Sequence, residues 1–219
     1  MLDELHVYDD LEAGSAAFNM AVDEALLESA AMPLLRFYRW RRPSISFGYF
    51  GRYAEVAAQS GDREIVRRWT GGGIAPHGDD LTYSVIIPAT NPLFAHSSLE
   101  IYAKLHESIR LALQTNDIEA SLAGSAAPKV SEACFANAVR ADVLSNGQKI
   151  AGAAHRRTRA GLLHQGSIQC RDLPGRFRND LARILCPRFE QKTLSPELRT
   201  RSTAIAAAKY GTTEWLKRR

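Results

Sequence analysis

The residues with the most evident chemical potential lie in one stretch, from Arg67 to His77, with the sequence RRWTGGGIAPH. Consecutive glycines let main-chain N–H groups approach a ligand closely, and guanidinium groups bind carboxylates or phosphates by paired contacts. We therefore interpret the stretch as a loop that binds an anionic or polarised group. Its spacing differs from GxGxxG and from the Gly-Lys-Ser/Thr of a phosphate-binding loop. The alternative is a flexible turn between two strands.

Lys149 and Cys134 are further candidates for the chemistry. Lys149 follows an Asn-Gly turn, and the small residues at 151–154 leave room for a ligand against the strand. Cys134 ends a stretch at 123–133 that is rich in Ala, Gly and Ser and predicts a long loop. A cysteine becomes nucleophilic where nearby cations lower its pKa, as the loop arginines and Lys149 would if the fold gathered them. The alternatives are a solvent-facing lysine and a small buried cysteine.

The remaining histidines and cysteines give weaker signals. His77, His155 and His164 each lie beside a glycine-rich segment or in a strand, so the pattern allows a cysteine–histidine pair without selecting one of them. Cys170 and Cys186 have no motif around them, and we assign both a structural role.

The composition excludes several classes of protein. With 219 residues, 45% hydrophobic and 24% charged, the chain can bury a core and is neither disordered nor fibrous. A net charge of +4 does not imply nucleic-acid binding. No apolar run reaches the roughly 20 residues of a membrane span, and the acidic N-terminus is unlike a secretory signal, so we expect a cytoplasmic protein without a membrane partner.

We expect neither disulfides nor a metal site. The three cysteines form no CxxC pair and no even framework. The carboxylates of Asp79 and Asp80 would suit Mg²⁺, but no second acidic motif accompanies them. We interpret this pair as part of a solvated turn before the next strand.

Hydrophobic periodicity predicts helices interspersed among strands. A helix is expected from Phe18 to before Pro33, and a capping box, Ser97 with Glu100, begins another over 98–114. Further helices are expected near 53–59, 176–186 and 196–209. Period-two alternation predicts strands at 34–40 and 45–49, which we interpret as a hairpin or meander, and others at 64–67, 81–87 and 161–169, with a hairpin turn at 146–147. This order predicts an α+β fold with a mixed, mostly antiparallel sheet flanked by helices.

Four segments together resemble the biotin/lipoate protein ligase and octanoyltransferase superfamily. They are NMAVDEAL at 19–26, RRWTGGGIAPH at 67–77 with LTYS at 81–84, Asp142 with GQKIAGAA at 147–154, and HQGSI at 164–168. The resemblance implies a class II biotin/lipoate ligase-like catalytic domain over residues 1–219, with two C-terminal helices from about 176 and no large accessory domain.

The resemblance also implies a pocket for an acyl chain and its activated carbonyl group. Its substrate-binding residues would come from the glycine loop, the Lys149 strand and the strand that follows. They are Arg68, Thr70, Gly71, Gly72, Gly73, Ala75, His77, Asp142, Ile150, Gly152, Ala154 and His164. Cys134 and Lys149 would be catalytic.

Within this superfamily the sequence looks most like the octanoyltransferases that use a cysteine thioester. In that interpretation Cys134 takes an octanoyl group from octanoyl-acyl carrier protein and yields it to a lysine of a lipoyl carrier domain, such as glycine cleavage H protein or the E2 subunit of a 2-oxo acid dehydrogenase. Transfer would need neither ATP nor a metal. The basic residues Arg67, Arg68, Arg156, Arg157, Arg159 and the C-terminus would form a docking surface for an acidic carrier.

Two departures from the transferase pattern leave alternatives open. Cysteine-type transferases often have Gly-Gly-Arg where this chain has three glycines, the pattern of ATP-dependent ligases, and His155 stands where Gln is common. The alternative is a lipoate-protein ligase that uses ATP and Mg²⁺ and proceeds through lipoyl-AMP. A second alternative is a non-catalytic lipoyl-domain binder, and a biotin ligase is a more distant one.

Overall fold

The structure, a computed structural model, describes residues 2–10, 12–126, 135, 137–170 and 172–218. Cys134 and most of the loop expected at 123–133 lie outside the described residues.

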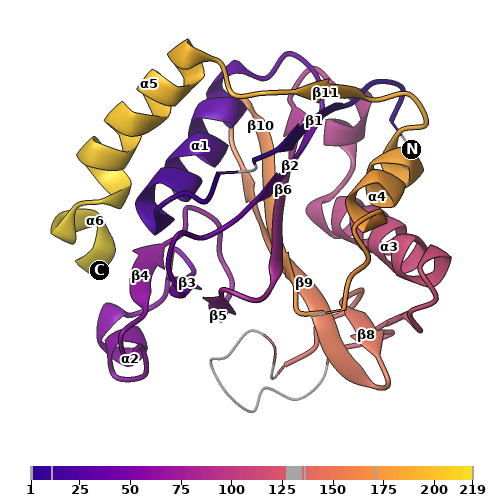
Figure 1. Cartoon of the computed structure of the whole chain (residues 1–219), viewed down its shortest axis with the longest axis horizontal. Coiled ribbons are helices and arrows are strands. Elements are labelled where there is room, and N and C mark those ends of the chain that lie inside the picture. The colour runs from indigo at the N-terminus through magenta and orange to yellow at the C-terminus, as the bar shows by residue number, and fades with distance from the viewer. Residues whose placement is uncertain (1, 11, 127–134, 136, 171, 219) are drawn as a thin grey trace.

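An eight-stranded sheet runs through the centre of the molecule (Figure 1). Its strands, in spatial order, are β11 (Glu190–Lys192), β1 (His6–Asp9), β2 (Leu34–Tyr38), β6 (Leu81–Pro88), β10 (Gly161–Ile168), β9 (Gln148–Arg157), β8 (Val143–Ser145) and β7 (Ser121–Leu122). The first three strands are parallel and all other neighbours are antiparallel. The predicted α+β fold with a mixed, mostly antiparallel sheet is therefore confirmed, as is the hairpin between β8 and β9.

A second sheet of three strands corrects one prediction. It has the order β4 (Glu64–Arg67), β3 (Ser44–Phe47), β5 (Ile74–His77). The expected hairpin between the strands at 34–40 and 45–49 is therefore wrong, because β2 and β3 belong to different sheets. The residues after β2 do not turn back to pair with β2. They pair with Gly14 instead: Gly14 N donates to Arg39 O, and Arg41 N donates to Gly14 O.

Helices cover both faces of the large sheet (Figure 1). On one face α1 (Ala16–Ser29) packs with α5 (Pro196–Ile205), and on the other α3 (Ser98–Thr115) packs with α4 (Phe177–Leu185). The larger hydrophobic core lies beneath α3 and α4, and two smaller cores lie beneath α1 and α5. Ser97 and Glu100 form the predicted capping box of α3, and Ser15 caps α1.

The remaining elements are short. They are α2 (Tyr53–Ala57), the 3₁₀ helix η1 (Pro92–Ala95), the π-helical turn η3 (Ala206–Tyr210) and α6 (Thr213–Lys217). The helix expected at 196–209 is thus α5 continued by η3. Strands β1, β5, β7 and β11 and helix α6 were not predicted, because segments of two to five residues carry too little periodicity to be recognised. In particular, residues 74–77 form a strand and not the end of the expected glycine loop. In the described part of the chain no helix is both long enough and apolar enough to cross a membrane.

Candidate active site

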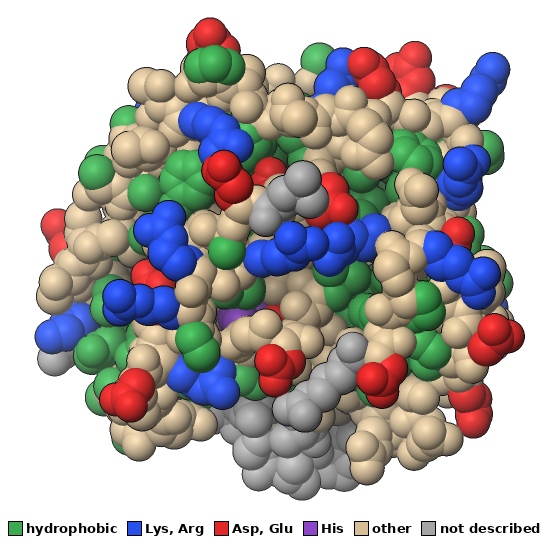
Figure 2. All heavy atoms as spheres, in the orientation of Figure 1, with side chains coloured by type: hydrophobic (Ala, Val, Ile, Leu, Met, Phe, Trp, Pro, Cys, Tyr) green, Lys and Arg blue, Asp and Glu red, His purple; other side chains and the backbone are tan. Residues whose placement is uncertain are grey.

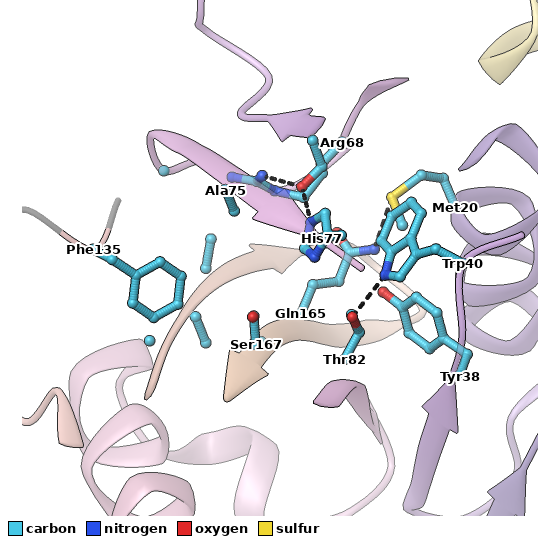
Figure 3. Close-up of a pocket in the computed structure, with 16 residues that line it drawn as sticks. Met20, Tyr38, Trp40, Arg68, Ala75, His77, Thr82, Phe135, Gln165 and Ser167 are labelled. Atoms are coloured by element: carbon cyan, nitrogen blue, oxygen red, sulfur yellow. Dashed lines mark hydrogen bonds between the residues drawn. The ribbon is translucent and has the colours of Figure 1, made fainter. Parts of the chain in front are cut away.

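A narrow cavity lies where the small sheet meets β9 and β10, and the volume in it that is open to a water-sized molecule is about 30 Å³. Small residues form much of its wall (Figure 3). Its lining comprises Met20, Tyr38, Trp40, Ser46, Arg68, Gly72, Ala75, His77, Thr82, Phe135, Gly152, Ala153, Ala154, Gln165, Gly166 and Ser167. The small side chains leave a slot, with Phe135 at one end and Met20, Tyr38 and Trp40 at the other (Figure 3).

Arg68 holds the glycine loop in shape. Its Nη2 donates to the carbonyl oxygens of Gly71 and Gly73 at 3.0 and 2.9 Å, and its Nη1 donates to Ser46 Oγ at 2.7 Å. Gly72 has a φ of +85°, a conformation that favours glycine, and its carbonyl oxygen packs against Gly48. The guanidinium group therefore orders the loop and lines the cavity at the same time.

His77 is fixed on three sides. Its Nε2 lies 2.6 Å from Ser46 Oγ, its Nδ1 lies 2.8 Å from Asp80 Oδ2, and its ring stacks on Trp40 with centroids 4.2 Å apart. The Asp80 side chain is fully buried and also accepts hydrogen bonds from the hydroxyls of Thr82 and Ser167. Burial alone would raise the pKa of Asp80, but the hydrogen bonds and the nearby imidazole outweigh it and lower that pKa. The expected solvated turn is therefore wrong for Asp80.

Lys149 lies beside the Phe135 end of the slot. Its Nζ is 2.8 Å from Asp142 Oδ2, donates to Asn137 O at 3.3 Å, and lies 5.4 Å from the Phe135 ring centroid. The Lys149 side chain covers Gly152, where an added Cβ would lie 2.4 Å from Lys149 Cε. The small residues at 151–154 were expected to leave room for a ligand, but at Gly152 the Lys149 side chain itself takes that room.

Asp142 is itself held from helix α3. The Tyr102 hydroxyl donates to Asp142 Oδ1 at 2.5 Å and accepts from Ala153 N at 3.1 Å, so one phenol ties α3 to both members of the hairpin. Burial and the charge of Asp142 raise the pKa of Tyr102, which keeps this hydroxyl protonated as a donor. Val139 N donates to Asp142 Oδ2 at 2.7 Å. The carboxylate that binds Lys149 is therefore rigidly placed.

A second buried network fixes the other end of the glycine loop. Thr70 Oγ1 donates to Gln165 Oε1 at 2.8 Å, and Gln165 Nε2 donates to Asp23 Oδ2 at 2.7 Å. Asp23 in turn accepts from Arg36 Nη1 at 2.7 Å, and both of these side chains are fully buried. Burial alone would lower the pKa of Arg36, but the negative charges of Asp23 and Asp10 outweigh burial and raise that pKa. Arg36 and Asp23 therefore remain an ion pair.

The structure does not bring every predicted substrate-binding residue to the cavity. Gly72, Ala75, His77, Gly152 and Ala154 line it together with Arg68. Four other predicted residues do not line the cavity but bind residues that line it or lie beside it. Thr70 bonds Gln165, the carbonyl groups of Gly71 and Gly73 bond Arg68, and Asp142 pairs with Lys149. Ile150 packs against the main core instead.

His164 also points away from the cavity. Successive residues of a strand face opposite sides, so Gln165 faces the slot while His164 faces α3. There His164 bonds Tyr83 at 3.0 Å and His155 at 2.5 Å, beside the buried His106. Burial lowers the pKa of His106 and of His155 to about 4, and that of His164 well below its ordinary value.

Two of the expected docking arginines are buried. Arg68 serves the glycine loop, and Arg67 donates to carbonyl oxygens of Tyr49, Gly51, Trp215, Leu216 and Arg218. Arg67 therefore holds α6 against the small sheet and cannot meet a partner protein.

Seven polar or aromatic lining residues are not among the predicted site residues: Tyr38, Trp40, Ser46, Thr82, Phe135, Gln165 and Ser167. Gln165 belongs to the quoted HQGSI motif, and Ser46 alternates with apolar residues in its strand, which were the available signals. In the described part of the chain no group of three or more His, Cys, Asp or Glu side chains is arranged to hold a metal ion.

Sequence comparison identifies the family to which this fold and its cavity belong. A model of the lipoyl protein ligase A/B catalytic domain matches residues 15–207, and the chain belongs to this family.

Similar curated proteins include octanoyltransferases LipM. That of Oceanobacillus iheyensis is 38% identical over 162 residues, covering 70% of this chain and 59% of the relative. That of Carboxydothermus hydrogenoformans is 37% identical over 163 residues, covering 70% and 61%. The chain therefore spans about three fifths of the length of these relatives.

Solved structures show the same fold. Lipoate-protein ligase A bound with ATP superimposes with a TM-score of 0.79 at 20% identity, covering 99% of both chains. A bipartite lipoate protein ligase from Thermoplasma acidophilum, studied with its E2 lipoyl domain, gives a TM-score of 0.69 at 20% identity, covering 99% of this chain and 96% of that one.

Proposed function

We propose that this protein is an octanoyltransferase of protein lipoylation, which moves an octanoyl group through a Cys134 thioester onto a lysine of a lipoyl carrier domain. The observation that carries the proposal is the position of Lys149, over Gly152 beside one end of a slot with small walls. An acyl chain in such a slot would be shielded from water, while its carbonyl group would meet a fixed cation. The LipM relatives support transfer as the reaction.

The proposed reaction has two steps. In the first, the Cys134 thiolate attacks the thioester of octanoyl-acyl carrier protein, a new carbon–sulfur bond forms, and the phosphopantetheine thiol leaves. In the second, the neutral amine of the acceptor lysine attacks the thioester carbonyl, the carbon–sulfur bond breaks, and an amide forms while Cys134 leaves and takes up the proton that the amine loses. Lys149 would stabilise the thiolate electrostatically, and Asp142 would keep the ammonium group in place.

The acceptor would be a lipoyl domain of the H protein or E2 type, and the reaction would take place in the cytoplasm. Carrier domains of this chemistry tend to be acidic. Figure 2 shows Lys and Arg side chains gathered across the middle of the face seen in Figure 1, which supports electrostatic steering of such a partner. Transfer would require no cofactor.

ATP-dependent ligation is the second candidate, and the run of three glycines favours it. Here free lipoate and ATP with Mg²⁺ would form lipoyl-AMP, and the glycine loop would let the phosphate approach the backbone.

Intact mass measurement separates the two reactions. The protein is incubated with octanoyl-acyl carrier protein without ATP. We expect one octanoyl group per chain, sensitive to hydroxylamine, and no adduct on Cys134→Ala. Cys170→Ala is the matched control, because Cys170 is only partly buried and lies outside the slot. Modification of a lipoyl domain only when lipoate and ATP are added would overturn transfer in favour of ligation.

A further inference from the structure

The cavity contains a second set of residues with the geometry of a nucleophile. Ser46 Oγ lies 2.6 Å from His77 Nε2, and His77 Nδ1 lies 2.8 Å from Asp80 Oδ2. All three side chains are buried, and Ser46 and His77 both line the cavity. Hydroxyl, imidazole and carboxylate thus follow one another at the distances of a Ser-His-Asp triad, which is recognised by geometry and not by sequence order.

The surrounding donors determine where the protons lie. Arg68 Nη1 can only donate, so Ser46 Oγ accepts from it at 2.7 Å and keeps its own hydrogen for His77 Nε2. The Asp80 carboxylate can only accept, so the Nδ1–H of His77 points to it. This is the tautomer in which the imidazole can take the serine proton.

Every member of the set is held in place. Thr82, Ser167 and the backbone of Gly78 donate to Asp80, and Trp40 stacks on the imidazole. The second amino group of Arg68 is bound by the glycine loop, so its first remains beside Ser46 Oγ. A fixed guanidinium group at this position would stabilise negative charge on the serine oxygen and on the carbonyl oxygen of a bound ester.

We propose that Ser46 is a second acyl-accepting nucleophile, independent of Cys134, for short-chain acyl esters and thioesters whose carbonyl group lies in the middle of the cavity. His77 lies between Phe135 and Trp40 along the slot (Figure 3), so an acyl chain that points toward Met20 and Trp40 from a carbonyl group at Ser46 has only part of the slot, and its leaving group would point toward Phe135. Only short acyl chains suit that space, because the volume open to a water-sized molecule in the whole cavity is about 30 Å³. Longer chains would place their carbonyl group nearer Phe135.

The reaction balances with water as the only co-reactant. Ser46 Oγ attacks the carbonyl carbon and passes its proton to His77 Nε2, the alcohol or thiol leaves with that proton, and an acyl-serine remains. Water then attacks the ester and gives a proton to His77, and Ser46 Oγ leaves and takes this proton back. The products are a short carboxylic acid and an alcohol or thiol.

A fluorophosphonate, which reacts with activated serines, tests the proposal without octanoyl substrates. The probe is added to the full chain and to Cys134→Ala, the intact mass is measured, and the labelled peptide is sequenced. We expect one label per chain on Ser46 in both proteins, and hydrolysis of 4-nitrophenyl butyrate that survives Cys134→Ala. Because the label is mapped on a protein with intact Ser46, the result does not depend on the folding of a serine variant.

Three substitutions complete the test. Ser46→Ala should abolish labelling, and Asp80→Asn should slow it by at least about 100-fold, since the carboxylate sets the imidazole tautomer. Ser44→Ala is the matched control, because Ser44 lies on the same strand, is buried, and donates to Arg42 O instead. Absence of a label on Cys134→Ala, or a label that maps elsewhere or persists in Ser46→Ala, would overturn the proposal whether or not the protein transfers octanoyl groups.

Discussion

Lys149 Nζ lies 2.8 Å from Asp142 Oδ2, and the two side chains are only 5% and 0% exposed. An ion pair so far from solvent is stable only when its partners satisfy each other, because an isolated buried charge is costly. Tyr102 and the Val139 amide saturate the carboxylate from the other sides. The pair is therefore part of the architecture as well as of the proposed chemistry.

Removal of this lysine should affect stability and activity together. We expect Lys149→Ala to abolish octanoyl transfer and to lower the free energy of unfolding by about 3–5 kcal/mol, because Asp142 loses its buried cation. The double variant Lys149→Met with Asp142→Asn should recover most of this stability but no activity. Urea denaturation and the intact-mass assay measure the two effects. Full transfer by the double variant would show that the ammonium group has no role in the reaction.

The site can also be disturbed by a single methyl group. In Gly152→Ala the new Cβ would lie 2.4 Å from Lys149 Cε and 2.7 Å from Nζ, so the lysine must move away from the slot. We expect a loss of roughly 100-fold in kcat, the scale seen when a catalytic group is misplaced by about 1 Å, together with a lower thermal stability, because the shifted lysine pairs less well with the buried Asp142. Gly175→Ala is the control, since nothing lies within 4 Å of the added atom. Equal rates for the two variants would contradict the position assigned to Lys149.

Local signals predicted the elements that local forces determine. The capping box at Ser97 and the Asn-Gly turn before Lys149 set a helix start and a hairpin within a few residues, and both were predicted correctly. The separation of β2 and β3 into two sheets was not, because it depends on the pairing of residues 39–41 with Gly14, which lies far away in the sequence.

The residues of the candidate site likewise differ in whether the sequence alone reveals them. The glycine loop has an unusual composition, so the sequence indicates it directly. Lys149 follows a turn where surface lysines are common, and only the resemblance to a known family made it a site candidate. Asp80 looks like a turn residue until the fold brings Ser167 beside it. Whether His164 or Gln165 lines the cavity depends on which face of β10 is turned toward it. Hydrophobic periodicity does not reveal this, because both faces of β10 are buried.

The buried histidines predict acid sensitivity. The pKa values of His106 and His155 are about 4 in the folded protein, against about 6.5 when unfolded, and that of His164 is also lowered. Below pH 6.5 the unfolded chain binds protons that the folded chain does not, so stability present above that pH is lost as the pH falls toward 4. We expect the urea midpoint to decrease steadily over this range.

His155→Gln provides the matched variant for that measurement. Glutamine has no titratable group and its amide can still bond His164, so the urea midpoint of this variant should depend less on pH between 6.5 and 4. A midpoint of the unsubstituted protein that stays constant over the same range would contradict neutral, buried imidazoles.

The docking of an acidic carrier should depend on basic residues at the Lys149 end of β9. Arg140 is exposed and lies two residues before Asp142, whereas Arg159 is exposed beyond the far end of β9, more than roughly 25 Å from Lys149 along the strand. We expect Arg140→Glu to lower kcat/KM for octanoyl-acyl carrier protein about 10-fold at low ionic strength and less at 0.5 M salt, because screening removes the repulsion. Arg159→Glu should change it little, and octanoyl-pantetheine, which lacks the carrier protein, should react equally with both variants. Equal losses for the two charge reversals would place the docking surface elsewhere.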